Sequence, residues 1–241
     1  MFFGSVPDNA NVRQIFFDPG SSFGGAMLVT TSAGDIYKFN SSGTPTLLAA
    51  IGADTEGMDI ASAAFGPFAG DLLVASEGTQ EIHAVSPTGT VTTLLLDNNP
   101  LDPVRVSEVE TISTVPTNLG ASGNPIEGFY VANYPIDVLF APASNFAGLQ
   151  GDAIVTEEES SNSDVFDLHY DGDGTTNAFA LTEFDQSGGV QLNQSEDGIF
   201  VTAQRITDVS VPEPSSLPVL LAGLGLICGA LYFGRKKARP A

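Results

Sequence analysis

Short apolar runs separated by glycine- and proline-rich turns fill most of the chain, and one pattern of them occurs three times. In each copy a Phe-x-Pro triplet precedes a second phenylalanine, which stands two residues before a glycine, and an apolar run follows. Apolar runs of this kind, bounded by turn residues, are typical of β-strands. The copies begin at Phe17, Phe65 and Phe140, and their strands are predicted over residues 26–29, 71–74 and 152–155.

A second strand in each copy shows the alternation of apolar and polar residues that indicates a half-buried strand. Glycine readily adopts the positive φ that tight turns need, so we expect a hairpin turn at the glycine that follows each of these strands. The strands cover residues 36–39, 82–85 and 165–168, with turns at Gly43, Gly89 and Gly172. Further strands are predicted over residues 45–48, 91–95, 128–131 and 198–201.

A repeat of about 46 residues built from such strands predicts an all-β fold. Between residues 1 and 210 no stretch places apolar residues at i, i+3, i+4 and i+7 over three turns, so we expect no helix there. The unit resembles the loose repeats of NHL-like and lactonase-like β-propellers, which implies antiparallel meanders arranged as four or five blades. Residues 74–155 fit neither one repeat nor two. We expect an incomplete propeller over residues 13–210, because a six-bladed ring needs more chain.

Charge divides the chain into two parts. The 241 residues include 29 acidic and 8 basic side chains, for a net charge of −21, yet four of the basic residues lie in the last seven positions. Residues 1–216 hold all 29 acidic residues against four basic ones, a net charge of −25. Such a surface repels phosphate groups, which excludes nucleic acid as a partner of this part. The one cysteine, Cys228, lies outside it, so it offers no cysteine nucleophile and no disulfide.

An uncharged apolar run near the C-terminus predicts a single transmembrane helix. Residues 217–233 form a helix of roughly 25 Å at ~1.5 Å per residue, close to the thickness of a bilayer core. Basic residues favour the cytoplasmic side, so residues 1–216 face outward and residues 234–241 form a cytoplasmic tail. The predicted helix carries Leu217, Leu220, Leu224, Cys228 and Phe233, and the basic stop consists of Arg235, Lys236, Lys237 and Arg239.

Residues 211–216 form a proline-rich link before this helix. Pro212, Glu213 and Pro214 favour an extended backbone that a processing enzyme can grip. The order of this triplet, a short apolar helix and a terminal basic cluster resembles the PEP-CTERM sorting signal of Gram-negative bacteria. The resemblance covers residues 211–239 and implies an exosortase as partner. It also implies an inner-membrane-anchored precursor that is delivered to the cell surface or the exopolysaccharide matrix.

Residues 1–12 lack the features of a signal peptide, which that sorting family uses to enter the export pathway. They contain no basic residue and no apolar core of seven or more residues. Export then depends on the C-terminal segment alone, or the chain is truncated at its start. We favour truncation, because an incomplete propeller points the same way.

Asp171 and Asp173 are candidate Ca²⁺ ligands, because carboxylates at alternate positions suit a hard cation. An EF-hand loop that begins at Asp171 needs a glycine where Thr176 stands and an acid where Thr182 stands, so that motif is excluded. The place of Gly172 in the repeat makes a hairpin turn the simpler interpretation, and a surface Ca²⁺ site is the alternative. We expect no other cofactor.

Other catalytic chemistry has little support in the sequence. The two histidines are His83, at a strand position that favours packing, and His169, just before a turn and expected to be exposed. No Gly-x-Ser-x-Gly motif accompanies them, so a Ser-His-Asp triad is not expected. The acidic run at residues 157–159 is interpreted as a solvated loop.

Two functions are compatible with these features. We favour a non-enzymatic exported protein that binds polysaccharide, cations or proteins outside the cell. The alternative is an exported metal-dependent hydrolase of the lactonase or strictosidine-synthase-like type, whose metal sits in the central channel. Three or more acidic or amide side chains from different blades that meet at the axis would favour the hydrolase.

Overall fold

The computed structural model describes residues 2–135, 137–158, 163–184 and 194–204. Apart from Gln204, these residues belong to one compact unit, Met1–Ala203; the rest of the second unit, Gln204–Ala241, lies outside the described residues. The described part of the first unit folds into four antiparallel sheets, which we call blades I to IV. The fold is therefore all-β, as the strand pattern predicts.

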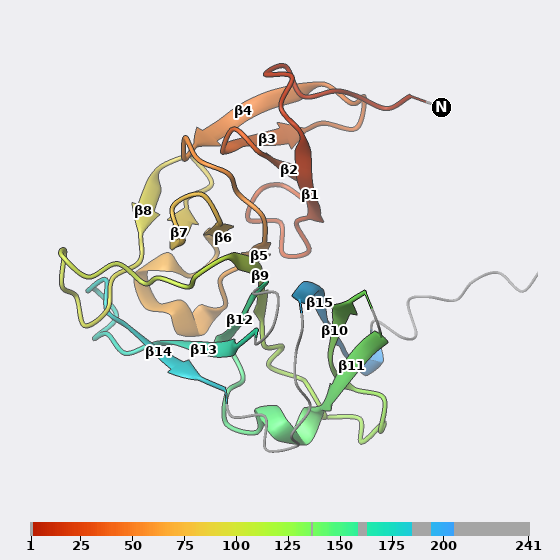
Figure 1. The fold of residues 1–241 in the computed structure, drawn as a ribbon, viewed down its shortest axis with the longest axis vertical. Helices are drawn as coiled ribbons and strands as arrows, with labels where there is room; N and C mark the ends of the chain where they lie inside the picture. Colours follow the sequence, from red (N-terminus) through yellow and green to blue (C-terminus); the bar gives the residue numbers. More distant parts are fainter. Residues whose placement is uncertain (1, 136, 159–162, 185–193, 205–241) are drawn as a thin grey trace, which may run out of the picture. The chain divides into compact units, whose positions relative to one another are not determined.

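Blades I and II are simple antiparallel meanders, whereas blades III and IV each include one strand that is distant in the sequence (Figure 1). Blade I contains β1 (Val12–Phe17), β2 (Met27–Thr31), β3 (Asp35–Phe39) and β4 (Pro45–Ala50). Blade II contains β5 (Met58–Ile60), β6 (Leu72–Ser76), β7 (Glu81–Val85) and β8 (Val91–Thr93). Blade III contains β9 (Val109–Thr114), β12 (Ala153–Glu157), β13 (Val165–Tyr170) and β14 (Phe179–Glu183). Blade IV contains β15 (Gln194–Val201), β10 (Gly128–Tyr134) and β11 (Asp137–Pro142).

The blades are arranged around a common centre in a propeller-like ring (Figure 1). An edge strand of each blade lies at this centre, where β1 contacts β5, β5 contacts β9 and β9 contacts β15. We call these four the inner strands. The prediction of a four- or five-bladed propeller-like body is confirmed with four blades.

Three apolar clusters of the described residues form the main core, one between each pair of successive blades, and a fourth, smaller one lies on the outer face of blade I. Strand β6 shows why the sequence folds this way. Leu72 and Val74 pack into the cluster shared with blade I, whereas Leu73 and Ala75 pack into the cluster shared with blade III. Because successive side chains of a strand point to opposite faces, a strand buried on both faces needs a continuous apolar run.

The second phenylalanine of each sequence repeat has the same role in the three clusters. Phe23, Phe68 and Phe146 are 1%, 8% and 1% exposed, and each belongs to a different inter-blade cluster. The first phenylalanines are not equivalent, because Phe65 is fully buried whereas Phe17 and Phe140 are 66% and 43% exposed. The repeat therefore marks one core position for each interface.

The two end blades each leave apolar residues exposed on their outer faces, although Val29, Tyr37 and Phe39 are buried on that of blade I. On blade I these residues include Ile15 and Phe17, and on blade IV they include Val138, Phe140 and Ile199. Cross-strand pairing places Ile15 opposite Val29 on β2, and Phe140 opposite Tyr130 on β10. The inner blades have no such face among the described residues, because the clusters cover both of their sides.

The irregular middle of the sequence has a structural explanation. After β9 starts blade III, the chain forms two strands of blade IV and then returns for β12, β13 and β14. The last strand, β15, goes back to blade IV. Residues 74–155 therefore cross between blades instead of completing one repeat, and strand pairing of this kind leaves no period in the sequence.

Two local predictions need correction. The expectation of no helix before residue 210 is wrong for two short 3-10 helices, η1 (Ala63–Phe68) and η2 (Ala143–Phe146), which lie at or just after Phe-x-Pro triplets and are too short to show helical periodicity. The strand pattern also missed β1, β5, β9, β11 and β14. Four of these strands are short or largely exposed, and β9 is buried but consists mostly of polar residues, so none of the five has a strong apolar run.

The expected turn at Gly172 is also different. Gly43 and Gly89 have the predicted positive φ, at 78° and 88°, but in the third hairpin the positive φ of 89° belongs to Gly174. A Cβ atom at Gly172 would lie 2.3 Å from the hydroxyl of Tyr170. Glycine is therefore required at residue 172 for space and not for backbone conformation.

No helix among the described residues is long and apolar enough to cross a membrane. The predicted transmembrane helix over residues 217–233 lies outside the described part of the chain, as do the proline-rich link and the basic stop.

We expect Phe179→Ala to destabilise the β domain by about 3 to 5 kcal/mol, because it leaves a cavity in a dense core. Phe179 is fully buried, and its ring centroid lies 5.6 Å from that of Phe65 and 5.3 Å from that of Tyr170. Urea unfolding followed by circular dichroism measures the change. The control, Phe17→Ala at a 66% exposed position, should stay within about 0.5 kcal/mol of the wild type. Equal effects of the two substitutions would contradict the assignment of the core.

Candidate functional site

Carboxylates gather where the inner strands begin. Six of them form what we call the acidic cluster: Asp54, Glu56, Glu77, Glu110, Glu158 and Glu196. Asp54 and Glu56 lie in the segment that joins β4 to β5, and Glu77 lies in the turn between β6 and β7. Glu110 is on β9, Glu158 follows β12, and Glu196 is on β15. The cluster thus draws residues from blades II, III and IV.

Arg13 on β1 supplies the positive charge of this region. Its Nε donates a hydrogen bond of 2.9 Å to Oδ1 of Asp54, and its Nη2 donates a second to Oδ2 of the same carboxylate. Its Nη1 lies 3.1 Å from Oε1 of Glu56, and its Nη2 lies 4.0 Å from Glu77. The planar guanidinium suits such paired contacts, so one arginine joins blade I to the acids of the next blade.

Burial, together with the charges of neighbouring acids, raises the pKa of four acids in the cluster. Burial raises the pKa of Glu110 to about 8, and the negative charges of Glu56 and Glu158 act in the same direction. Burial also raises the pKa of Glu56 to about 7, with the charge of Arg13 opposing the shift. Burial raises the pKa of Glu77 and of Glu158 as well. Removal from water disfavours the charged form, so part of the cluster holds protons near neutral pH.

Three of these residues could hold a metal ion by geometry. One carboxylate oxygen each from Asp54, Glu56 and Glu77 lies within 4.8 Å of the others, and oxygen ligands suit Ca²⁺. Arg13 is already paired with this trio, however, and occupies the place that a cation would take. The arrangement can therefore balance charge with the guanidinium alone, and a metal would compete with Arg13.

Sequence reasoning missed the acidic cluster. It treated residues 157–159 as a solvated loop, but Glu157 ends β12 and is only 6% exposed. Residues 109–114 gave no strand signal, because their two apolar residues, Val109 and Ile112, are three positions apart and do not alternate with polar ones. The local pattern does not show that four other segments bring acids to the same place.

Asp171 and Asp173, the predicted Ca²⁺ ligands, lie in the turn between β13 and β14. Oδ1 of Asp173 accepts hydrogen bonds from the backbone N–H of Thr175 and Thr176, at 3.0 and 3.1 Å. The hydroxyl of Thr175 donates a further hydrogen bond to Oδ1, and this bond lowers the pKa of Asp173 most. The two backbone bonds lower it in the same direction. The turn is thus stabilised by Asp173 itself, in line with the hairpin interpretation, and Ca²⁺ binding there stays a prediction.

The two histidines lie where the repeat predicts. His83 is 4% exposed and burial lowers its pKa, while its Nδ1 lies 3.1 Å from the hydroxyl of Thr93. The side chain of His169 is 53% exposed and its Nδ1 lies 2.9 Å from Oδ1 of Asp152. His83 is therefore a packed strand residue, and His169 pairs with a buried carboxylate at the surface.

The comparisons with known proteins concern the C-terminal segment and the fold. Residues 210–237 match the family model of the PEP-CTERM protein-sorting motif. No curated protein matches the chain. A crystal structure of a Bacteroides caccae protein of unknown function is similar with a TM-score of 0.45 and 13% identity, over 79% of this chain and 52% of that one. The chain spans about half of that protein's length, and so loose a likeness identifies neither a function nor a ligand.

We expect the free energy of unfolding to fall as the pH rises from about 5 to about 8. Glu110 and Glu56 have folded pKa values of about 8 and about 7, above the ordinary carboxyl value, so the folded chain binds more protons than the unfolded chain in this range. Glu110→Gln should flatten the decline, as measured by urea unfolding at several pH values. Glu183→Gln, at an exposed position on β14, should leave the slope unchanged.

We expect Arg13→Gln to lower the free energy of unfolding by about 1 to 2 kcal/mol at pH 8, because it leaves three carboxylates without their positive partner. The effect should be smaller at pH 5, where Glu56 holds a proton. Arg105→Gln is the matched control, since the Arg105 side chain is 55% exposed in its pair with Glu81 and should contribute less than about 0.5 kcal/mol. An Arg13 effect that is independent of pH would contradict this electrostatic account.

Proposed function

We propose that this protein is an exported, exosortase-processed protein with a non-enzymatic binding or structural role in the extracellular polysaccharide matrix. The observation that carries the proposal is the PEP-CTERM sorting motif at residues 210–237. The negative charge of residues 1–216 keeps the body soluble and away from anionic lipid headgroups, so only the C-terminal segment is suited to hold the chain at a membrane.

In this function the C-terminal segment first anchors the precursor and then directs its cleavage. The helix over residues 217–233 anchors the precursor in the inner membrane of a Gram-negative cell, with the basic stop on the cytoplasmic side. An exosortase recognises Pro212, Glu213 and Pro214 at the outer side of the membrane. Removal of the anchor then releases the β domain to the cell surface or the matrix.

We expect a Pro212→Ala, Glu213→Ala double variant to accumulate as the uncleaved precursor in the membrane fraction, because the exosortase loses its recognition sequence. Immunoblots of fractionated cells of an exosortase-bearing host distinguish the precursor from the shorter mature form. The same host without its exosortase should give the same accumulation with the wild-type chain. Pro100→Ala, at an exposed proline in a loop, should be processed normally. Normal cleavage of the double variant would overturn the proposal.

A metal-dependent hydrolase is the second candidate, and the acidic cluster is the observation that favours it. Acidic side chains from three blades meet at the centre, as that function requires. We place it second because Arg13 is paired with the three carboxylates closest to one another. Calorimetric titration of the wild type and of Glu56→Gln with Ca²⁺ separates the two functions. The hydrolase requires stoichiometric binding that Glu56→Gln abolishes, whereas binding that survives in this variant belongs to another site, such as Asp171 and Asp173.

A further inference from the structure

Polar side chains join the end of β12 in blade III to the start of β15 in blade IV. The hydroxyl of Thr156 donates a hydrogen bond of 3.3 Å to the backbone oxygen of Ser195. The amide Nε2 of Gln194 donates one of 3.1 Å to Oε1 of Glu158. The carboxyl groups of Glu158 and Glu196 are also in hydrogen-bond contact. Glu158, which follows β12, therefore holds two side chains of the neighbouring blade.

The contact between Glu158 and Glu196 needs a proton. An ionised carboxylate only accepts hydrogen bonds, so two carboxyl groups bond to each other only when one of them carries a hydrogen. When both are ionised, they repel one another instead. The two acids therefore titrate as a pair, and the closed arrangement binds one proton.

The surroundings of this pair favour retention of the proton. Burial raises the pKa of Glu158, and the negative charges of Glu196 and Glu108 act in the same direction. Arg13 opposes the shift, but the hydrogen bonds of its guanidinium go to Asp54. The other charged groups near the pair are all acidic: Glu56, Glu77, Glu110 and Asp197.

The start of β15 depends on contacts with blade III, because its pairing within blade IV is irregular. Strand β15 pairs with β10 from Val201 to Gly198, but the register shifts before Ser195. Glu196 and Asp197 fall within this shift, where the ladder of hydrogen bonds is locally disrupted. A force that separates Glu196 from Glu158 therefore acts on the least regular part of the strand.

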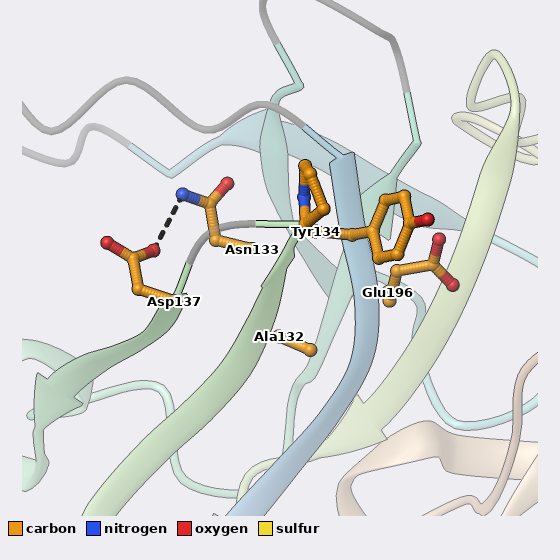
Figure 2. Close-up of a pocket in the computed structure, with 6 residues that line it drawn as sticks. Ala132, Asn133, Tyr134, Asp137 and Glu196 are labelled. Carbon is orange, nitrogen blue, oxygen red and sulfur yellow. Dashed lines mark hydrogen bonds between the residues drawn. The ribbon is translucent and has the colours of Figure 1, made fainter.

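Glu196 also lines a pocket of about 480 Å³ at the end of blade IV. In Figure 2 its carboxylate lies beside the ring of Tyr134. The other lining residues are Ala132, Asn133, Pro135 and Asp137. The position of the start of β15 thus determines one wall of this pocket.

We propose that Glu158 and Glu196 form a proton-dependent latch, which holds the start of β15 against blade III while the pair shares a proton and releases it when both acids are charged. The latched state binds one proton more than the open state, so it is favoured as the pH falls and lost as the pH rises. Release opens the wall of the pocket that Glu196 forms. The latch goes beyond the proposed function and does not depend on it.

Hydrogen exchange of the full chain in a non-ionic detergent, followed by mass spectrometry, tests the latch. EDTA in the buffers ensures that no divalent cation replaces the proton. Peptides from β15 report the latch, whereas peptides from β6, a strand whose five residues are all buried, report global unfolding. Between pH 5 and pH 9 we expect the ratio of the β15 to the β6 protection factor to fall about tenfold, the effect of about one pKa unit.

Glu158→Gln should keep this ratio constant, because its amide donates to Glu196 and accepts from Gln194 without a titrating proton. Glu196→Gln should do the same, and circular dichroism checks that both variants are folded. Glu183→Gln removes the same charge at an exposed position on β14 and should behave as the wild type. A wild-type ratio that is independent of pH, or a ratio that falls equally in the two latch variants, would overturn the inference.

Discussion

Burial of both faces of each blade is the constraint on which the rest of this structure depends. A short sheet is stable only when its apolar faces are covered by other elements. Between successive blades, three apolar clusters provide this cover. One phenylalanine of each sequence repeat fills each cluster, as Phe23, Phe68 and Phe146. The two end blades lack a neighbour on one side, and this is why their apolar residues, such as Phe17 and Val138, are exposed.

The same arrangement determines where charge collects. The inner strands begin close together, so polar residues at their starts are forced near one another. Arg13 compensates Asp54 and Glu56, whereas Glu110 lies among further acids and has a raised pKa. Electrostatic repulsion in a partly buried site costs stability. We therefore expect the centre of the ring to be sensitive to pH, while the apolar clusters supply the stability that offsets this repulsion.

The sorting motif and the folded body occupy different parts of the chain. The sorting motif lies in the last thirty or so residues and acts through local features: a proline-rich link, an apolar run and basic residues. Clusters of side chains in the body depend instead on three-dimensional proximity. The pocket at the end of blade IV illustrates this, because β10 and β11 supply Tyr134 and Asp137 while Glu196 comes from β15 (Figure 2).

Local order in the chain was enough to predict the all-β class, the strands with strong apolar runs, the positive φ of Gly43 and Gly89 and the sorting motif. Each of these depends on neighbouring residues, so a sequence pattern reveals it. The tertiary structure alone decided that β9 pairs with β12, that Glu110 and Glu196 lie near Arg13 and its acids, and which apolar faces stay exposed. The physical reason is that contacts between distant segments depend on the packing of whole sheets, which leaves no periodic signal in the sequence.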